Sequence, residues 1–174
     1  MRKSVVLLVV LVAGLVWLWI DQRAEASPHP VRMVTRLPME NMAHERLEAF
    51  TTLNEIRATL GMSSLQENTA LQQAAQAHAD YLVRHRLSSH FEKSTQKGFT
   101  GSAPMDRALR AGYKARFVGE NLSTQSRNGL DSLHGLFSAI YHRFGFLNPS
   151  FDEVGIGIAQ DLSLYTHLTL PTKA

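Results

Sequence analysis

Residues 138–157 read SAIYHRFGFLNPSFDEVGIG, and this segment contains the transition that decides the fold of the chain. It ends a pattern of helical periodicity, turns at residues 148–149 and enters a run in which glycine alternates with valine and isoleucine. His142 stands near the end of the predicted helix, and an acidic pair at residues 152–153 stands where the predicted strand begins. Glycine in a strand lets a second backbone come close. The segment therefore predicts a helix, a turn and a strand that packs tightly against another element.

Length and composition limit what the chain can be. Its 174 residues are enough for one domain with its own core. Cysteine is absent, so disulfides, thiolate metal sites and thiol nucleophiles are excluded. The formal net charge is +3, but the first 26 residues contribute +1 and Lys173 contributes another +1. The remaining body carries about +1, which is too little positive charge to predict nucleic acid as a partner.

The N-terminus has the features of an export signal. A basic start at residues 2–3 is followed by 16 apolar residues, 5–20, and by an Ala-x-Ala cleavage pattern at residues 24–26. We favour a cleaved signal peptide within residues 1–26 over an uncleaved anchor, since a spanning helix needs about 20 apolar residues. In either case the body is predicted to be exported, and either periplasmic or extracellular. If the signal is not cleaved, residues 4–20 would anchor the protein to the cytoplasmic membrane and would be its only membrane contact.

Helical periodicity dominates the first half of the body. Residues 27–38 contain three prolines and no period, which predicts a linker. Apolar residues then recur at helical spacing over residues 39–60, just before Gly61. A second helix is predicted over residues 68–86, with asparagine as its N-terminal cap. A third, short helix is predicted to begin at Pro104.

The second half mixes strands with helices. Residues 113–118 are predicted to be extended, and the Gly-Glu-Asn-Leu run at residues 119–122 is predicted to break that strand. Residues 130–143 have the periodicity of one helix. Residues 154–159 alternate apolar with small side chains, which predicts a final strand.

The last residues do not resemble a natural C-terminus. The run YTHLTLPTKA is closer to a translated sequencing adapter at the end of an assembled fragment. We therefore expect residues 163–174 to be a non-native tail. The native domain would then be truncated at its C-terminus, with a final strand missing and a sheet edge unpaired.

Eight short motifs occur in an order and spacing that resemble one family of secreted proteins. They are Asn54-x-x-Arg57, Ala74-Ala75-x-x-His78-Ala79, Ser89-His90, Asp106-Arg107, Gly112-Tyr113, Gly119-Glu120-Asn121, His142-Arg143 and Glu153-Val154-Gly155-Ile156-Gly157. Together they resemble the CAP superfamily of cysteine-rich secretory, antigen 5 and pathogenesis-related proteins, in its bacterial SCP-like branch. The resemblance implies an α+β fold, an α-β-α sandwich with a small, mostly antiparallel sheet between helical layers. It assigns residues 27–46 to a linker and the start of the first helix, and residues 47–162 to the domain.

The cleft of that family is lined by two histidines and two acids, and in some members it binds zinc or another divalent ion. Matched by position, the resemblance implies that His90, Glu120 and His142 line this cleft. The second acid usually precedes the second histidine in its helix, but residues 138–139 are serine and alanine here. Glu153 is the candidate replacement, and without it the site has three members. The implied cofactor is Zn²⁺ or another divalent cation, with His90, Glu120, His142 and Glu153 as candidate metal ligands.

Each candidate residue also has a structural interpretation. Neutral imidazoles suit a divalent metal, so cleft lining is favoured for His90 and His142 over helix capping. Glu120 is expected to face the cleft, whereas Glu153 is more simply explained as the solvated end of a strand. Structural roles are favoured for four further residues: His78 as a core histidine, His85 as a surface histidine, Asn121 as a residue that fixes loop backbone, and Arg57 as a salt-bridge partner for a nearby acid.

The sequence favours a binding protein over an enzyme. It lacks His-Glu-x-x-His and Gly-x-Ser-x-Gly, so neither a metallopeptidase nor a serine hydrolase is indicated. We predict a secreted or periplasmic domain with a His/Glu cleft for a divalent metal and an unidentified extracellular or envelope ligand. One alternative is an extracellular metal-dependent hydrolase acting on peptides or envelope material. The other is a lipid- or sterol-binding module, for which Phe144, Phe146 and Phe151 are the only indication.

Overall fold

The computed structural model describes residues 39–114, 117–160 and 166–173, so the predicted export signal and the proline-rich linker lie outside the described residues. None of the helices in this described part has the length and apolar character needed to cross a bilayer. The elements, in chain order, are α2 (Met39–Thr59), β1 (Gln66–Glu67), α3 (Thr69–His85), α4 (Pro104–Arg110), β2 (Val118–Ser126), α5 (Gly129–Ser138), α6 (Ile140–Phe146), β3 (Glu153–Val154), β4 (Gly157–Gln160) and β5 (Thr166–Lys173).

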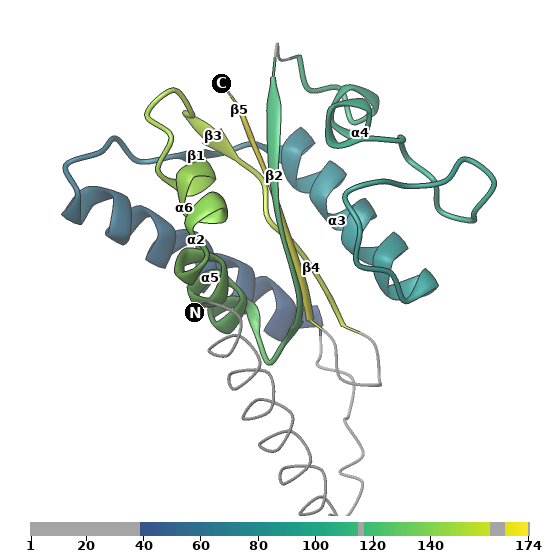
Figure 1. The fold of residues 1–174 in the computed structure, drawn as a ribbon, viewed down its shortest axis with the longest axis horizontal. Coiled ribbons are helices and arrows are strands. Elements are labelled where there is room, and N and C mark those ends of the chain that lie inside the picture. The colour runs from purple at the N-terminus through teal and green to yellow at the C-terminus, as the bar shows by residue number, and fades with distance from the viewer. Residues whose placement is uncertain (1–38, 115–116, 161–165, 174) are drawn as a thin grey trace, which may run out of the picture. The chain divides into compact units, whose positions relative to one another are not determined.

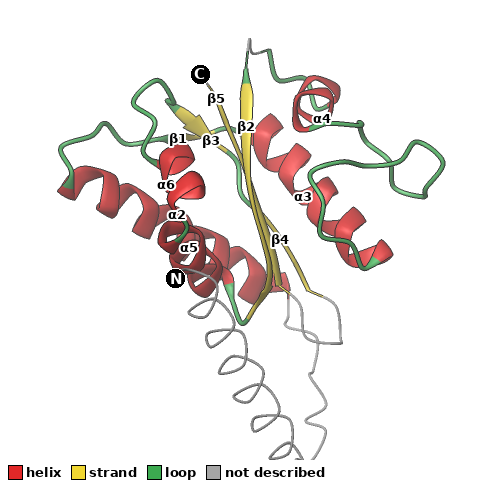
Figure 2. Ribbon diagram, in the orientation of Figure 1, coloured by secondary structure: helices red, strands yellow, loops and turns green. Residues whose placement is uncertain are grey.

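A small sheet lies between two groups of helices (Figures 1 and 2). Its strand order is β1-β3-β5-β2, and β4 also pairs with β5. Strand β5 is antiparallel to β2, β3 and β4, whereas β1 is parallel to β3. Helices α3 and α4 lie on one side of the sheet, and α2, α5 and α6 lie on the other. The fold is therefore α+β with helices on both faces, and its sheet is mixed.

Strand β5 occupies the middle of the sheet. It pairs with β2 from Val118↔Lys173 to Ser126↔Thr166 and with β4 from Gly157↔Thr169 to Gln160↔Thr166. These residues lie in the segment 163–174, which we predicted to be a non-native tail. The pairing shows where the segment lies in the structure but does not show whether it belongs to the natural protein. The predicted non-native tail and the predicted truncation therefore stay predictions.

Two glycines bring α3 directly onto the strands, as the alternating pattern predicted. A Cβ at Gly155 would lie 2.2 Å from the backbone N of Gln72, and one at Gly157 would lie 2.3 Å from the carbonyl carbon of Ala75. Gly155 and Gly157 are two positions apart and point to the same face of the extended chain. The backbone atoms of α3 that they face, in Gln72 and Ala75, are about one helical turn apart. The strand and helix therefore meet through backbone at two successive points.

The first three predicted helices are confirmed as α2, α3 and α4. Oδ1 of Asn68 accepts hydrogen bonds from the backbone N of Ala70 at 2.9 Å and of Leu71 at 3.2 Å, which is the predicted cap of α3. Gly61 has a φ of +71°, a left-handed conformation that suits glycine and ends α2.

The prediction that residues 119–122 break a strand is wrong. These residues lie inside β2, which begins at Val118 instead of ending there. Glycine and asparagine are poor strand formers on their own, but continuous pairing with β5 from Val118 to Ser123 overrides that preference.

The single strand predicted at residues 154–159 is two strands in the structure, β3 and β4, separated at residues 155–156.

The single helix predicted over residues 130–143 is two helices in the structure. Ala139 has a ψ of 120°, so α5 ends there and α6 begins in a new direction. Nε of Arg143 donates to the carbonyl O of Phe137 at 2.7 Å and satisfies one of the carbonyls left free at the end of α5. The rings of Phe137 in α5 and Phe146 in α6 stack with their centroids 4.7 Å apart, so the two helices pack against each other through these side chains.

Arg57 is not the salt-bridge partner that we predicted. Its guanidinium donates to four backbone carbonyls, those of Ser63 at 2.9 Å, Phe146 at 2.6 Å, Asn148 at 3.4 Å and Phe151 at 3.4 Å. The last three carbonyls belong to the end of α6 and to the turn before β3. Arg57 therefore fixes that turn against α2, while burial lowers its pKa.

Candidate functional site

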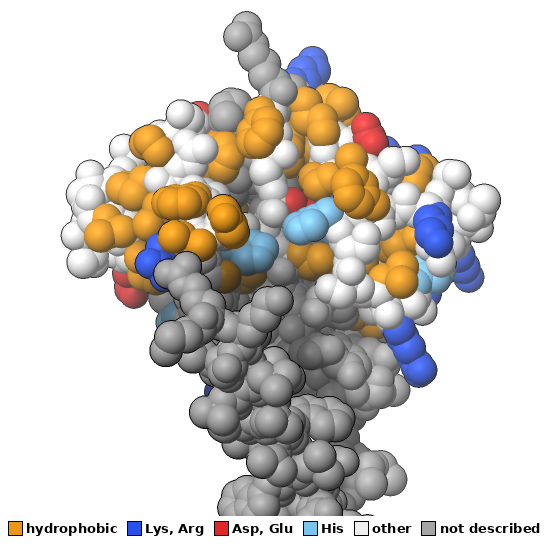
Figure 3. Space-filling view, in the orientation of Figure 1, with side chains coloured by type: hydrophobic (Ala, Val, Ile, Leu, Met, Phe, Trp, Pro, Cys, Tyr) orange, Lys and Arg blue, Asp and Glu red, His pale blue; other side chains and the backbone are white. Residues whose placement is uncertain are grey.

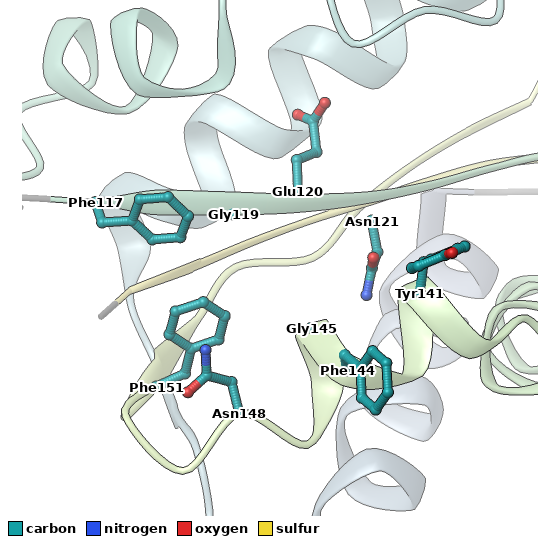
Figure 4. Close-up of a pocket in the computed structure, with 9 residues that line it drawn as sticks. All are labelled: Phe117, Gly119, Glu120, Asn121, Tyr141, Phe144, Gly145, Asn148 and Phe151. Atoms are coloured by element: carbon teal, nitrogen blue, oxygen red, sulfur yellow. The ribbon is translucent and has the colours of Figure 1, made fainter.

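The candidate site is organised around strand β2. Consecutive side chains of a strand point to opposite faces of the sheet, and Glu120 and Asn121 do so in β2 (Figure 4). Glu120 binds His90, and Asn121 binds His142. His90 belongs to the loop after α3, and His142 belongs to α6. The two predicted histidines therefore flank β2 on opposite faces of the sheet.

Glu120 is fully engaged on the α3–α4 side. Its Oε1 accepts from Nδ1 of His90 at 2.7 Å, and its Oε2 accepts from Nη2 of Arg107 at 2.6 Å. Nη1 of Arg107 also donates to the carbonyl O of His90 at 3.1 Å. The side chain of Glu120 is 3% exposed, whereas that of His90 is 42% exposed. A buried carboxylate thus orients a partly exposed imidazole, whose Nε2 makes no hydrogen bond to any described residue.

A second histidine and glutamate pair lies behind Glu120 and is fully buried. Nδ1 of His78 is 2.8 Å from Oε1 of Glu92. Nε2 of His78 is 3.0 Å from the carbonyl O of Ser89 and 3.8 Å from Oε1 of Glu120. Both ring nitrogens therefore face oxygen atoms, and a ring with a proton on each nitrogen satisfies all of them. The predicted core position of His78 is confirmed, but His78 also joins the candidate site.

The surroundings of Glu92 favour its ionised form. Burial raises the pKa of Glu92, but the hydrogen bond from His78, the backbone N–H of Thr100 and the charge of Arg107 together lower it below its usual value of 4.5. Nε of Arg107 lies 3.9 Å from Oε1 of Glu92, so this guanidinium stands between the carboxylates of Glu92 and Glu120. Buried carboxylates need such partners, because an unpaired buried charge is costly.

Asn121 performs the equivalent task on the α6 side. Its Oδ1 accepts from Nδ1 of His142 at 2.9 Å, and its Nδ2 donates to the carbonyl O of His142 at 3.0 Å. A Cβ at Gly145 would lie 3.1 Å from Nδ2 of Asn121, so glycine there leaves room for the amide. The predicted structural role of Asn121 is confirmed, and the backbone that it fixes is that of α6.

Glu153 is engaged by a different set of residues. The hydroxyl of Tyr113 donates to its Oε2 at 2.5 Å, and Nδ2 of Asn68 donates to its Oε1 at 3.1 Å. Burial and the Glu153 carboxylate raise the pKa of Tyr113. Both oxygen atoms of Glu153 are therefore committed to residues that join α3 and the loop after α4 to β3.

The described residues do not gather the four predicted ligands into one metal cluster. No group of three or more His, Asp or Glu side chains in this part of the chain could hold a metal ion. The two predicted histidines share one feature. In each, Nδ1 is hydrogen bonded to a side-chain oxygen, which leaves Nε2 with its lone pair. Histidines that bind metal usually have their second nitrogen held in this way.

A pocket of about 310 Å³ lies beside β2 on the α6 side (Figure 4). Gly119, Glu120 and Asn121 contribute the β2 wall, and Tyr141, Phe144 and Gly145 contribute the α6 wall. Phe117 and Phe151 line it as well, with their ring centroids 6.1 Å apart. On the face of the molecule in Figure 3, histidine side chains stand on both sides of a hollow, with acidic and apolar side chains close by. The candidate site therefore combines polar histidines with exposed aromatic rings.

Two site residues were missed by the ligand assignment from the sequence. Glu92 lies two positions after His90, and Arg107 belongs to the Asp106-Arg107 motif, but neither was assigned a role. The available signals were the position of Glu92 next to a candidate histidine and the place of Arg107 in a family motif. Their pairing with His78 and Glu120 depends on the packing of α3, α4 and β2.

Comparison with known proteins gives sequence and structural relatives, of which we describe four, all bacterial. The uncharacterized protein YkwD of Bacillus subtilis is 23% identical over 144 residues, which are 83% of this chain and 53% of the relative. An extracellular SCP-domain protein of Bacillus anthracis has a TM-score of 0.66 at 19% identity, over 84% of this chain and 44% of that one. An outer surface protein of Borrelia burgdorferi has a TM-score of 0.67 at 15% identity, over 81% and 98%.

These likenesses show the shared fold. The chain spans about half the length of the Bacillus relatives that it matches. A cysteine-rich secretory protein of Staphylococcus aureus is also similar, with a TM-score of 0.59 at 18% identity over 78% of this chain and 41% of that one. The model of the cysteine-rich secretory protein family, CAP, matches residues 50–169. The chain therefore belongs to the CAP family.

Proposed function

We propose that this protein is an exported binding domain whose β2 cleft holds a divalent cation, with Zn²⁺ as the first candidate, between His90 and His142. The observation that carries the proposal is the matched arrangement of the two imidazoles. Nδ1 of His90 donates to Glu120 and Nδ1 of His142 donates to Asn121, so each Nε2 is available as a ligand. In this proposal Glu120 and Asn121 orient the two imidazoles without ligating the cation, and Glu153, which bonds Tyr113 and Asn68, has no part in the site.

The charge arrangement favours binding over catalysis. Glu120 is paired with Arg107 at 2.6 Å, and Glu92 is fully buried and bonded to His78 and Thr100, so neither carboxylate is free to take a proton from a substrate. A bound cation with two protein ligands would keep positions open for water or for a ligand atom. The open positions favour one second candidate, a metal-dependent hydrolase, because metal-bound water is a nucleophile near neutral pH.

Export is part of the same proposal. The names of the Bacillus anthracis and Borrelia burgdorferi relatives place those proteins outside the cell or on its surface. The basic start and apolar run of residues 2–20 support the same destination for this chain. Its ligand would then be an extracellular or envelope component.

Calorimetric titration of the full chain with Zn²⁺ near neutral pH tests the metal site. We expect saturable 1:1 binding that weakens by at least about tenfold in both His90→Ala and His142→Ala. His134→Ala is the matched control, because His134 is an exposed histidine of α5 away from these contacts. Circular dichroism establishes that each variant is folded. Identical titrations for the wild type and both site variants would contradict the proposal.

The hydrolase candidate needs a separate measurement. Zinc-loaded protein would be incubated with a mixture of peptides and with cell-envelope fragments, and products would be followed by mass spectrometry. Turnover that is lost in His142→Ala, together with zinc, would favour the hydrolase. Zinc binding without turnover would favour a binding domain over a hydrolase.

A further inference from the structure

Among the strands that the structure describes, β2 lies at the end of the sheet and has a partner on one edge only. It pairs with β5 along one side, and no strand in the described ranges pairs with its other side. In a strand, the backbone N–H and C=O groups of alternate residues point to opposite sides. About half of the backbone polar groups of β2 therefore point away from β5, and such an edge is a template for a further strand.

This edge lacks the usual protection against pairing. Residues 118–126 read VGENLSTQS and contain neither lysine nor proline, and the single charge, Glu120, is neutralised by Arg107. An irregularity in the pairing is confined to residues 123–126. Strand β2 contacts α4 on one side and α5 and α6 on the other, so its free edge lies between the helical layers (Figure 1).

An aromatic pocket adjoins the first half of this edge. Phe117 precedes β2 and is 53% exposed, and Phe144 of α6 is 63% exposed. With the buried ring of Phe151 they line the pocket of about 310 Å³ (Figure 4). Exposed aromatic rings around a cavity mark a binding site for an apolar group. The pocket is large enough for one aromatic or branched aliphatic side chain.

We infer that β2 binds an extended peptide by strand addition, with one large apolar side chain of the peptide in the Phe117–Phe144–Phe151 pocket. Only a polypeptide main chain has donors and acceptors that alternate at the spacing of a strand edge, and in this mode main-chain bonds give affinity while pockets give specificity. The inference rests on the cleft being a binding site, as the proposed function has it, but it does not require a metal.

The peptide can be sought with a defined set of probes. Capped ten-residue peptides of serine, threonine and valine would carry phenylalanine, leucine or serine at the centre, and their binding to the full chain would be measured by fluorescence anisotropy in EDTA. We expect the phenylalanine and leucine peptides to bind with Kd below about 1 mM and the serine peptides at least about tenfold more weakly. Absence of binding by all the probes would overturn the inference. Since EDTA removes any metal, a failed zinc site and a failed peptide site give different results.

Two N-methylated forms of the best peptide test strand addition itself. One carries methyl groups on the backbone nitrogens of odd residues, and the other carries them on even residues. Only one set of N–H groups faces β2 in an added strand, so one form should bind as the parent does and the other should lose binding. Equal affinity of the two N-methylated forms would overturn strand addition. The pocket would then be a binding site for apolar groups without strand pairing.

Variants of α6 test the pocket without disturbing the core. Phe144→Ala is expected to weaken binding of the phenylalanine peptide by about tenfold. Ile140→Ala is the matched control, because Ile140 lies on the same helix, is 57% exposed and does not line the pocket. Equal effects of the two substitutions would overturn the role of the pocket. Protection of the β2 amides from hydrogen exchange in a peptide-free dimer would identify a second copy of the chain as the occupant and would also overturn the inference.

Discussion

Arg107 is the residue on which the buried charges of the site depend. It lies 2.6 Å from Oε2 of Glu120 and 3.9 Å from Oε1 of Glu92, and it also holds the backbone of His90. One guanidinium can offset only one of the two carboxylates. His78 faces both of them, with Nδ1 2.8 Å from Oε1 of Glu92 and Nε2 3.8 Å from Oε1 of Glu120, so it joins the same buried polar group. The orientation of the exposed His90 ring therefore depends on residues that solvent cannot reach.

Glu92→Gln tests this balance of charge. The substitution keeps the shape of the side chain but leaves Arg107 and His78 with one carboxylate instead of two. Because removing one partner from a buried ionic group is strongly destabilising, we expect a loss of about 3 kcal/mol in the free energy of unfolding. Urea denaturation followed by circular dichroism measures the loss. Asp131→Asn breaks an exposed pair with Arg127 and should leave stability almost unchanged. Equal effects of the two substitutions would contradict the balance.

The contact between α3 and the strands works at the scale of elements. Three alanines, Ala74, Ala75 and Ala79, lie on the buried face of α3 among larger side chains. Gly155 and Gly157 give the strands no side chain at the same place. Small residues on both sides let the helix backbone approach the strands closely, and this approach sets how far α3 stands from β2. The distance between His78 on α3 and Glu120 on β2 therefore depends on two glycines outside the site.

Gly157→Ala measures the tightness of that contact. The new Cβ would lie 2.3 Å from the carbonyl carbon of Ala75, which is backbone that cannot rotate away. Overpacking of this kind costs about 3 kcal/mol, so the urea midpoint should fall clearly. Gly135→Ala is the matched control, since a Cβ there meets nothing within 4 Å and the residue lies inside α5. That change should raise stability by up to about 1 kcal/mol. Two shifts of the same sign would contradict the close contact.

For the molecule as a whole, local signals were predictable from the sequence and distant pairings were not. The cap at Asn68 and the end of α2 at Gly61 depend on neighbouring residues, so periodicity and cap chemistry predicted them correctly. Strand β2 was missed because its pairing with β5 joins residues far apart in the sequence, such as Gly119 and Thr172. Three of the four acceptors of Arg57 were missed for the same reason, since they are the backbone carbonyls of Phe146, Asn148 and Phe151.

The candidate site follows the same rule. The resemblance to the family matched His90 and Glu120, which the structure brings together at 2.7 Å. It could not show that Glu153 would be taken up by Tyr113 and Asn68, because that contact joins residues 40 and 85 positions apart. Nor could it show that Arg107 would occupy the second oxygen of Glu120. Sequence motifs identify side chains that could bind a metal. The hydrogen-bond partners that these side chains already have depend on the packing of distant elements.

The contacts of Glu92 and Tyr113 make the stability of the whole molecule depend on pH. The pKa of Glu92 is lowered in the folded state from 4.5, so its ionised form adds stability above pH 4.5, and this stability is lost as pH falls through the lower folded value. The pKa of Tyr113 is raised from 10.0, so its protonated form adds stability below pH 10.0, and this stability is lost as pH rises through the folded value. We therefore expect the free energy of unfolding to fall below about pH 4.5 and above about pH 10.

Urea titrations across this range, made on wild type, Glu92→Gln and Tyr113→Phe, separate the two contributions. The difference between wild type and Glu92→Gln should be constant near neutral pH and shrink in acid, because protonation of Glu92 removes the charge that the substitution also removes. The difference between wild type and Tyr113→Phe should be constant near neutral pH and shrink above about pH 10, where the phenol ionises in the unfolded chain but stays protonated beside Glu153 in the folded protein. A Glu92→Gln difference that persists undiminished at pH 3 would mean that packing, and not charge, makes Glu92 stabilising.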